Sequence, residues 1–423
     1  MTANLNLSSP DHVGSFKQGK NKPLLMWCSS HRTLSFEEIP LLLEAGFRVI
    51  PSSVDMWTFK IDRKVIDDLC PDWKSSVDVP AEVIDELHQV NLYLDEGTAP
   101  FKKADQDLIN RYVDVLYVTI LPNVAERVLS WFRGLVVFRP FGHGSLNTYS
   151  KVCESRKGDL DAFSRSPNYV WCPILSTLGE PEDPRITANE MMVGAFVSSG
   201  RLQGRWEGDK SEPYLVETIP RITQQEYYRR IYLDFAKAYA ELPLQILGGN
   251  PPRGGDLNDE RIMGTLDDEA YHRTISRCRA SIYHGDSPYH VHYHPIEYMA
   301  MGVPVLFHKN SALTAEARRI GKTDAQLKEC GMYLNEKEAL GVAKRLLADV
   351  SLAKDISQRQ RFFCTEVFSR NLALSGAQQI REYMVSSPEV QFGIARERKR
   401  AMRRNYLFRK IMAVRSWLRR SNS

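Results

Sequence analysis

The stretch SIYHGDSPYHVHYHPIEYMAMGVPVLF, residues 281–307, carries the pattern that decides the fold. It begins in an apolar run, passes through a polar loop, and ends in a second apolar run, VPVLF, at 303–307. Between the runs, Pro295 stands where proline is best tolerated, at the first position of a helix, and small or apolar residues follow it as far as Gly302. The stretch therefore predicts strand, loop, helix and strand.

The same alternation of apolar strands and amphipathic helices recurs along the whole chain. Predicted strands lie at 23–29, 112–121, 134–142, 214–219, 242–249, 279–284 and 303–307. Predicted helices lie at 36–45, at 224–240, after Thr265 and near Pro295. Capping boxes are expected from Ser35 with Glu38 and from Thr223 with Glu226, and Gly46 is expected to end the first helix. This order predicts two parallel, doubly wound α/β sheets, whose ligands bind beyond the carboxyl ends of the strands.

The domain division follows from the polar, Gly/Pro-rich region 176–212, where the connection between the two sheets is expected. The predicted parts are a flexible N-terminus at 1–22, an N-terminal domain at 23–205, a C-terminal domain at 206–385 and a basic tail at 386–423. A chain of 423 residues is long enough for two such domains.

Composition narrows the class of protein. The seven cysteines form no CxxC pair, and an odd number argues against a disulfide framework, which suits a reducing cytosol. The first twenty-odd residues are polar, and no run of about 18 apolar residues occurs, so neither a signal peptide nor a membrane span is expected. We therefore expect a cytoplasmic protein.

The tail concentrates the positive charge. Residues 396–420 hold eleven Lys or Arg and one Glu, whereas the whole chain has a net charge of only +4, so the body of the protein is acidic. Leu407, Ile411, Val414 and Leu418 recur at helical spacing. A basic amphipathic helix of this kind suits an anionic membrane surface. The alternatives are a solvated charged helix, a helix that binds a protein partner and an RNA-binding arm, and the acidic body argues against nucleic acid.

Four of the ten histidines lie in the first stretch, at 284, 290, 292 and 294. If 289–294 were extended, His290, His292 and His294 would share one face and could hold zinc. However, no nearby acid or cysteine completes a familiar zinc spacing, and tyrosines are interleaved. A hydrogen-bonded loop without a ligand and a nucleotide site are the alternatives.

The residues that follow favour the nucleotide site. The start of a helix at Pro295 offers amide groups and a dipole to a phosphate, and His294 can donate to the same group. Glu297 in the first turn can accept hydrogen bonds from a ribose diol.

The run HPIEYMAMGVPV (294–305) resembles the donor-binding signature of GT-B-fold glycosyltransferases. The resemblance covers about 213–384 by motif and the first half by architecture alone. It implies two Rossmann-like domains that face each other across a cleft and a nucleotide-sugar donor bound by the second. The nucleotide sugar is then a substrate, and neither a metal nor another cofactor is required.

The resemblance also assigns donor-binding residues. Glu297 matches the glutamate that contacts ribose, Arg221 the basic residue used on the diphosphate, and Gly248 with Gly249 the backbone beside the base. The histidines and the nearest acid are expected around the diphosphate, as His284, Asp286, His292 and His294.

Two features bear on the stereochemistry of transfer. Many retaining members carry a second glutamate where this chain has Tyr289. The pair His294–Pro295 is similar to the HP pair of inverting sialyl- and Kdo-type transferases, and LDEGTAP (94–100) is similar to their acidic motif.

The acceptor side is expected on the first domain. Inverting transfer needs a base for the acceptor hydroxyl, and the ranked candidates are His143, Asp95 and His31, each at a predicted strand end. Arg139 is expected to pair with a buried acid, and Trp27 and Trp57 are expected either to stack on a sugar or to pack in the core.

We therefore predict a glycosyltransferase at the cytoplasmic face of the membrane, acting on a glycan or lipid-linked acceptor in surface polysaccharide or glycolipid synthesis. The alternatives are a nucleotide-sugar epimerase of GT-B architecture, a noncatalytic nucleotide-sugar or glycan-binding protein and, last, a zinc hydrolase.

Overall fold

The computed structural model describes residues 22–29, 32–52, 55–56, 59–60, 77–143, 147–198, 200, 202–248, 257, 259–264 and 266–400. Five predictions fall outside these residues: the N-terminal segment up to residue 21, the roles of His31, Gly249 and Trp57, and the apolar stripe of the tail beyond residue 400.

The first domain is built on a parallel five-stranded sheet with the order β2-β1-β5-β6-β7. Its strands are β2 (Arg48–Pro51), β1 (Leu24–Cys28), β5 (Val115–Thr119), β6 (Leu135–Arg139) and β7 (Tyr169–Trp171). Every residue of β1, β5 and β6 is buried, as expected for a sheet covered on both faces. The predicted strands at 23–29, 112–121 and 134–142 are therefore confirmed.

Short helices connect these strands. They are α1 (Arg32–Glu44), α4 (Ala81–Gln89), α5 (Leu94–Gly97), α6 (Lys103–Tyr112), α7 (Pro122–Leu129), α8 (Tyr149–Ser155) and α9 (Asp161–Arg165), and β3 (Asp55–Met56) pairs with β4 (Phe59–Lys60). The capping box predicted from Ser35 and Glu38 is wrong, because α1 begins three residues earlier and buries both side chains. Gly46 does end the helix region, with a left-handed φ of 97°.

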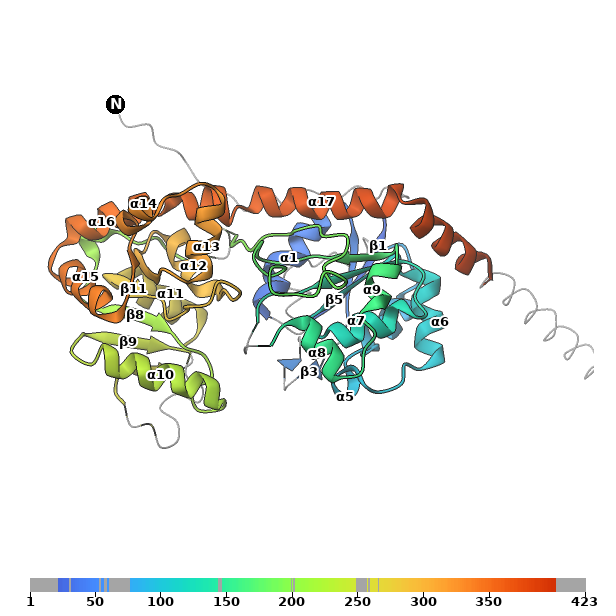
Figure 1. Cartoon of the computed structure of the whole chain (residues 1–423), viewed down its shortest axis with the longest axis horizontal. Helices are drawn as coiled ribbons and strands as arrows, with labels where there is room; N and C mark the ends of the chain where they lie inside the picture. The colour runs from blue at the N-terminus through green and yellow to red at the C-terminus, as the bar shows by residue number, and fades with distance from the viewer. Residues whose placement is uncertain are drawn as a thin grey trace, which may run out of the picture.

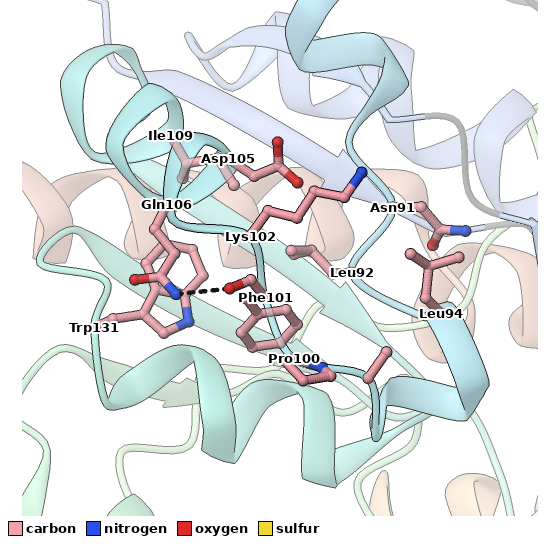
Figure 2. A pocket seen from close by; sticks show the side chains of 11 residues that line it. Asn91, Leu92, Leu94, Pro100, Phe101, Lys102, Asp105, Gln106, Ile109 and Trp131 are labelled. Carbon is pink, nitrogen blue, oxygen red and sulfur yellow. Dashed lines mark hydrogen bonds between the residues drawn. The ribbon is translucent and has the colours of Figure 1, made fainter.

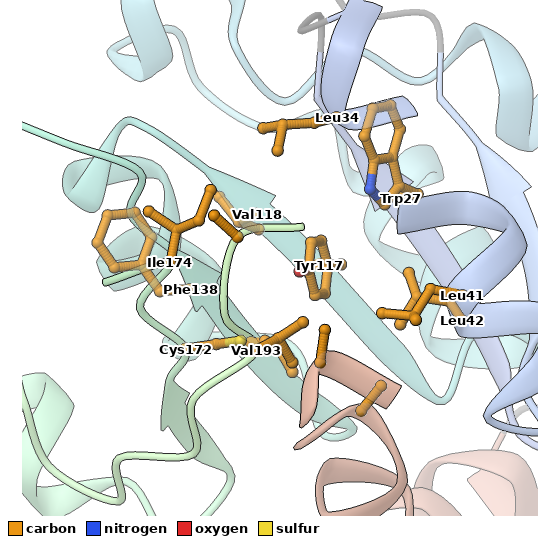
Figure 3. Packing of buried hydrophobic residues seen from close by; sticks show 14 of the residues in the cluster. Trp27, Leu34, Leu41, Leu42, Tyr117, Val118, Phe138, Cys172, Ile174 and Val193 are labelled. Atoms are coloured by element: carbon orange, nitrogen blue, oxygen red, sulfur yellow. The ribbon is translucent and has the colours of Figure 1, made fainter. Parts of the chain in front are cut away.

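The core of this domain contains an ion pair. In Figure 3, side chains of α1 and of the segment 172–193 converge on Tyr117 of β5, and Trp27 is buried beside them. Arg139 Nη2 lies 2.6 Å from Glu38 Oε1, and both side chains are almost fully buried. The predicted pairing of Arg139 with a buried acid is therefore confirmed, and Trp27 is a core residue.

The second domain has a parallel six-stranded sheet with the order β10-β9-β8-β11-β12-β13. Its strands are β8 (Leu215–Thr218), β9 (Leu244–Leu247), β10 (Ile262–Gly264), β11 (Ala280–Ile282), β12 (Val305–His308) and β13 (Met332–Tyr333). The four strands predicted in this half are β8, β9, β11 and β12. The two parallel sheets confirm the predicted α/β class.

The helices of the second domain lie beside this sheet. They are α10 (Glu226–Ala238), α11 (Asp268–Arg277), α12 (Tyr293–Met301), α13 (Ala312–Arg319), α14 (Asp324–Glu329), α15 (Glu336–Ala348) and α16 (Val350–Arg359), with a 3₁₀ turn η2 (Gly208–Lys210) and a π-helical turn η3 (Phe363–Val367). The capping box predicted from Thr223 and Glu226 is wrong, because the N-cap is Gln225, which makes no side-chain cap bond. Helix α12 begins at Tyr293, two residues before Pro295.

The C-terminal helices return to the first domain. Helix α17 (Arg370–Ser386) begins at the edge of the second domain in Figure 1, runs across the first domain and packs against α1. A further helix, 388–400 within the described residues, buries Val390 and Ile394, and Arg398 pairs with Asp114 beside β5. None of the described helices combines the length and the apolar content that crossing a bilayer demands.

Candidate functional site

The strand order of the second sheet reverses at β8, which we call the switch point. The chain adds β9 on one side of β8 and later adds β11 on the other side, so the connections leave β8 in opposite directions. Doubly wound sheets bind ligands at such a point, beyond the carboxyl ends of the strands. Glu217 near the end of β8 and His284 just after β11 meet here.

Glu217 is the centre of a buried polar cluster. Its Oε1 accepts a short hydrogen bond from His284 Nδ1 and a 3.2 Å bond from the backbone amide of His284. His294 Nε2, in the first turn of α12, lies 3.3 Å from the same oxygen. The side chains of Glu217, His284 and His294 are 0%, 4% and 6% exposed.

The cluster shifts the pKa of Glu217 and the pKa of His294. Burial raises the pKa of Glu217, but His294 and His284 together outweigh it and hold that pKa below its usual range. Burial is the largest effect on His294 and lowers its pKa, although Glu217 acts in the opposite direction. The cluster therefore favours an ionised Glu217 that depends on its two imidazole neighbours.

His292 and His290 extend the cluster toward the first domain. The ring centroid of His292 lies 4.9 Å from that of His284 and 5.3 Å from that of His294. His292 Nδ1 lies 3.2 Å from the hydroxyl of the buried Tyr283, and its Nε2 lies 3.3 Å from Nε2 of His290. Residues 289–294 do not form a strand, because a turn precedes His290 and α12 begins at Tyr293. The rings of His290, His292 and His294 still lie next to one another, with centroids 4.5 and 5.3 Å apart.

Helix α12 also positions Glu297. This carboxylate is buried, and its Oε2 accepts a 3.0 Å hydrogen bond from Tyr271 of α11. The next residue, Tyr298, has its hydroxyl 2.5 Å from Thr218 Oγ1 at the end of β8. The predicted ribose-binding glutamate thus stands one turn beyond His294, on the helix that is tied to the switch point.

Arg221 and Gly248 lie beyond the neighbouring strand ends. The amide of Arg221 donates to the carbonyl of Gly248 at 3.2 Å, and both residues have left-handed backbones with φ of 55° and 83°. A side chain at Gly248 would lie 3.2 Å from Thr218, so a residue without Cβ suits this close approach. Burial lowers the pKa of Arg221, while Tyr228 of α10 acts against it. Asp286 is exposed on the loop after β11 and lies near Tyr227 of α10.

The first domain contributes a second imidazole–carboxylate pair. His143 follows β6, and its Nε2 lies 2.8 Å from Glu182 Oε1, with the two side chains 8% and 0% exposed. The same carboxylate accepts hydrogen bonds from the amides of Tyr149 and Ser150, at 2.7 and 2.8 Å. Glu182 accepts hydrogen bonds from these two amides, so it is an acceptor for His143 as well. His143 then carries its proton on Nε2, and Nδ1 is the ring nitrogen without a proton.

This pair contacts the second domain directly. The amide of His143 donates to the carbonyl of Tyr289 at 3.0 Å, and their ring centroids are 5.8 Å apart. Gly142 and His290 form an isolated antiparallel bridge next to this contact. Two further links join the domains, from Ser176 to Glu316 of α13 and from Thr177 to the carbonyl of Pro288. The loop after β6 therefore meets the loop after β11.

Asp95 lies on a different turn. It is exposed, and both Asp95 and Glu96 have left-handed φ values, 49° and 55°, which are unusual outside glycine. Glu96 pairs with Arg156, and the hydroxyl of Tyr93 donates to the carbonyls of Cys28 and Thr119 at the ends of β1 and β5. The turn is thus tied to the carboxyl edge of the first sheet, and no described contact joins Asp95 to His143.

A small pocket lies beside this turn, between the segment 91–102, helix α6 and Trp131 (Figure 2). Its aromatic rings pack on one another, with the centroids of Phe101 and Trp131 5.6 Å apart and the guanidinium of Arg127 4.6 Å from the Phe101 ring. Gln106 donates to the carbonyl of Phe101 at 3.1 Å. None of the predicted catalytic or donor-binding residues lines the pocket, and its contacts fix the segment after Asp95.

Two residues of this arrangement were not predicted. Glu217 is the one acid in the apolar run YLVETI, and a carboxylate in a strand buried on both faces is a signal that the sequence does contain. Glu182 lies in the polar segment GEPEDPR, where nothing distinguishes it from its acidic neighbours. His284, His292, His294, Glu297, Arg221 and Gly248 are all brought to the carboxyl edge of the second sheet.

Solved structures share this architecture over most of the chain. Sucrose-phosphate synthase from Thermosynechococcus elongatus aligns over 86% of this chain and 100% of that one, with 13% identity and a TM-score of 0.54. A glycosyltransferase from Rickettsia africae aligns over 87% and 100%, with 12% identity and a TM-score of 0.55. HepE from Anabaena, solved in complex with UDP and glucose, aligns over 86% and 99%, with 11% identity and a TM-score of 0.55. No family model and no curated protein matches the sequence. The predicted GT-B fold is confirmed.

Proposed function

We propose that the protein is a glycosyltransferase that moves a sugar from a nucleotide-sugar donor to a glycan or lipid-linked acceptor. The observation that carries this proposal is the contact between His143 and Tyr289. It brings a Glu–His pair at the carboxyl edge of the first sheet against the loop that leads to the switch point of the second. Transfer needs both parts in one place, a base for the acceptor and a cradle for the departing diphosphate.

The donor would bind along the second sheet. The amides at the start of α12 and the side chain of Arg221 would face the diphosphate, and Glu297 would accept from the ribose diol. The base would lie beside the backbone of Gly248, at the end of β9. That HepE was solved in complex with UDP and glucose supports a nucleotide-sugar donor. The transfer drawn here needs no redox cofactor.

The acceptor would be activated from the first domain. With Nε2 directed at Glu182, His143 has Nδ1 to accept the proton of the acceptor hydroxyl, and Glu182 would stabilise the resulting imidazolium. Asp95 and His31 follow His143 as candidate bases. The left-handed backbone at Asp95 supports its place in the ranking, because such conformations gather at functional sites.

The basic tail would hold the enzyme on an anionic membrane at the cytoplasmic face through Arg396–Arg420. In the described part, Arg396, Lys399 and Arg400 are exposed, while Val390 and Ile394 dock the helix on the first domain. Each basic residue near such a surface contributes about 1 kcal/mol. A chain ending at Ser387 should no longer sediment with anionic vesicles, and sedimentation equal to that of the full chain would exclude the tail as the anchor.

The test of the donor site is thermal stabilisation by UDP, GDP, CMP and TDP and by their sugars. A nucleotide at about 100 times its dissociation constant should add about 2.7 kcal/mol of stability. Glu297→Gln should weaken this stabilisation, because the amide keeps an acceptor for Tyr271 but loses the charge offered to the ribose. The matched control is Glu269→Gln, an exposed acid in the first turn of α11. Stabilisation by no nucleotide, or by one that Glu297→Gln leaves unchanged, would contradict the donor site.

Turnover then separates the enzyme from its alternatives. A transferase hydrolyses its donor slowly without an acceptor and transfers the sugar when a suitable hydroxyl is added. An epimerase would convert the donor without any acceptor, and a binding protein would leave it intact.

A further inference from the structure

We propose that Glu217, His284 and His294 form a binding site for a divalent transition-metal ion, with zinc as the ion that their chemistry fits best. The three residues come from β8, from the loop after β11 and from the first turn of α12. Their ligating atoms all lie within 4.8 Å of one another. This inference revises our expectation from the sequence that no metal is involved.

The spacing between Glu217 and His294 matches a metal centre. Two atoms that each lie about 2.0–2.1 Å from a tetrahedral zinc ion are about 3.3 Å apart. The distance between Glu217 Oε1 and His294 Nε2 is 3.3 Å. His284 Nδ1 is hydrogen-bonded to the same oxygen, and an ion entering the cluster would take the place of the proton in that bond, which is released to solvent.

Burial and pairing also favour a cation. Within the described residues, the ion-pair partners of Glu217 are His284 and His294, and neither a Lys nor an Arg pairs with this fully buried carboxylate. The Nε2 atom of His294, which faces Glu217, is buried without a hydrogen-bond partner among the described residues. Native proteins rarely leave such an atom unsatisfied, and a bound ion accounts for it.

The ligand set indicates which ion. Two imidazoles and one carboxylate with an open fourth position form a set that zinc uses in catalytic sites, whereas magnesium and calcium prefer oxygen ligands. His292, with its ring 4.9 Å from that of His284, lies beside the open position. The inference does not rest on the proposed function. If both hold, the fourth position would accept an oxygen of the donor diphosphate and add charge stabilisation to the leaving group.

The experiment uses the full chain, stripped with a chelator and titrated with Zn²⁺ against a competing dye, and separately with Co²⁺. We expect one ion per chain and the intense visible absorption of a tetrahedral cobalt centre. Glu217→Gln and His284→Ala should each weaken Zn²⁺ binding by about 100-fold or more, since even outer ligand partners are worth about 10–100-fold. The matched control is His88→Gln. His88 is a buried histidine of α4 that is hydrogen-bonded to the carbonyl of Pro51, and this variant should bind Zn²⁺ as the wild type does.

Far-UV circular dichroism checks that each variant has folded. If His284→Ala does not fold, Glu217→Gln, which preserves side-chain volume, still tests the site. Failure of the stripped wild type to bind Zn²⁺, or binding that both variants retain, would overturn the metal site. Repeating the nucleotide panel on the stripped protein keeps the two proposals apart. Nucleotide stabilisation without Zn²⁺ binding would overturn the metal alone, and Zn²⁺ binding without nucleotide stabilisation would support the metal and contradict the donor site.

Discussion

Glu182→Gln tests the arrangement that holds His143. Oε1 of Glu182 accepts from His143 Nε2 and the amide of Tyr149, and Oε2 accepts from the amide and the hydroxyl of Ser150. A glutamine has the same shape but replaces one of these oxygens by an NH₂ group. Each of the two oxygens accepts from one buried backbone N–H at the start of α8. Whichever oxygen is replaced, the new NH₂ group therefore faces a backbone N–H, and two donors meet.

The magnitude follows from these contacts. A buried donor left unsatisfied costs about 1–3 kcal/mol, and losing a negative charge beside the first amides of a helix costs about 0.5–1 kcal/mol more. The free energy of unfolding of the first domain should therefore fall by about 2–4 kcal/mol. If the NH₂ group takes the Oε1 side, it also turns His143 to the tautomer that protonates Nδ1, and the proposed base is lost. Transfer should then fall by about 10²–10⁴-fold, as when the carboxylate of a catalytic triad is replaced by its amide.

Urea unfolding followed by circular dichroism measures the first effect, and the rate of sugar transfer at saturating donor measures the second. Glu180→Gln is the matched control, because Glu180 lies two residues away and makes only an exposed pair with Arg319, which should matter little. A loss of stability below about 0.5 kcal/mol in Glu182→Gln would show that this carboxylate does not accept the two amides. Unchanged transfer in the folded variant would remove the Glu182–His143 pair from catalysis.

Three further changes test the fold by urea unfolding. Arg139→Met should destabilise the first domain by about 3–5 kcal/mol, because it leaves Glu38 buried without its cation, whereas Arg230→Met removes only an exposed pair and should change little. Gly376→Ala would place a Cβ 2.0 Å from the carbonyl oxygen of Met192 and should cost about 1–3 kcal/mol, while Gly341→Ala meets nothing within 4 Å and should stabilise α15 by about 0.5–1 kcal/mol. Hydrogen bonds from Arg261, the largest cause, lower the pKa of Asp259 to about 2. A carboxylate whose pKa is lowered by folding stabilises the fold at every pH above its unfolded pKa of about 3.9. Asp259→Asn should therefore lower the free energy of unfolding by about 1–2 kcal/mol at neutral pH. The difference in unfolding free energy between variant and wild type should disappear as the pH falls from about 4 to about 2. These contacts would be contradicted if Arg139→Met and Arg230→Met, or Gly376→Ala and Gly341→Ala, changed the free energy of unfolding equally. They would also be contradicted if the destabilisation by Asp259→Asn did not depend on pH.

Local pattern was enough to predict the central strands of both sheets and helix α12. The runs PLLMWC (23–28) and VPVLF (303–307) are apolar throughout, and a segment of this length without polar alternation is typical of a buried parallel strand. Pro295 and Gly302 bracket α12 because proline fits only the first turn and glycine readily adopts the left-handed cap, here with φ of 96°. These effects act over a few residues, so one sequence is sufficient to show them.

The capping boxes and the histidine face show where local pattern fails. Ser35 and Glu38 fit a capping box, but Glu38 is held inside α1 by Arg139, which lies 101 positions away. Alternation at His290, His292 and His294 predicted one face of a strand, but α12 begins at Tyr293 and ends the extended run. In both cases a contact distant in sequence, or the start of the next element, outweighed the local preference.

The sequence by itself determined two parallel α/β sheets, the helix at the edge of the second and the identity of most residues gathered there. Only the tertiary structure decided that Glu217 meets His284 and that Glu182 meets His143, partners 67 and 39 positions apart. The physical reason is that strand order, not spacing along the chain, brings the carboxyl ends of β8 and β11 together. A carboxylate buried at that point must find its partners there, because leaving it uncompensated would cost several kcal/mol.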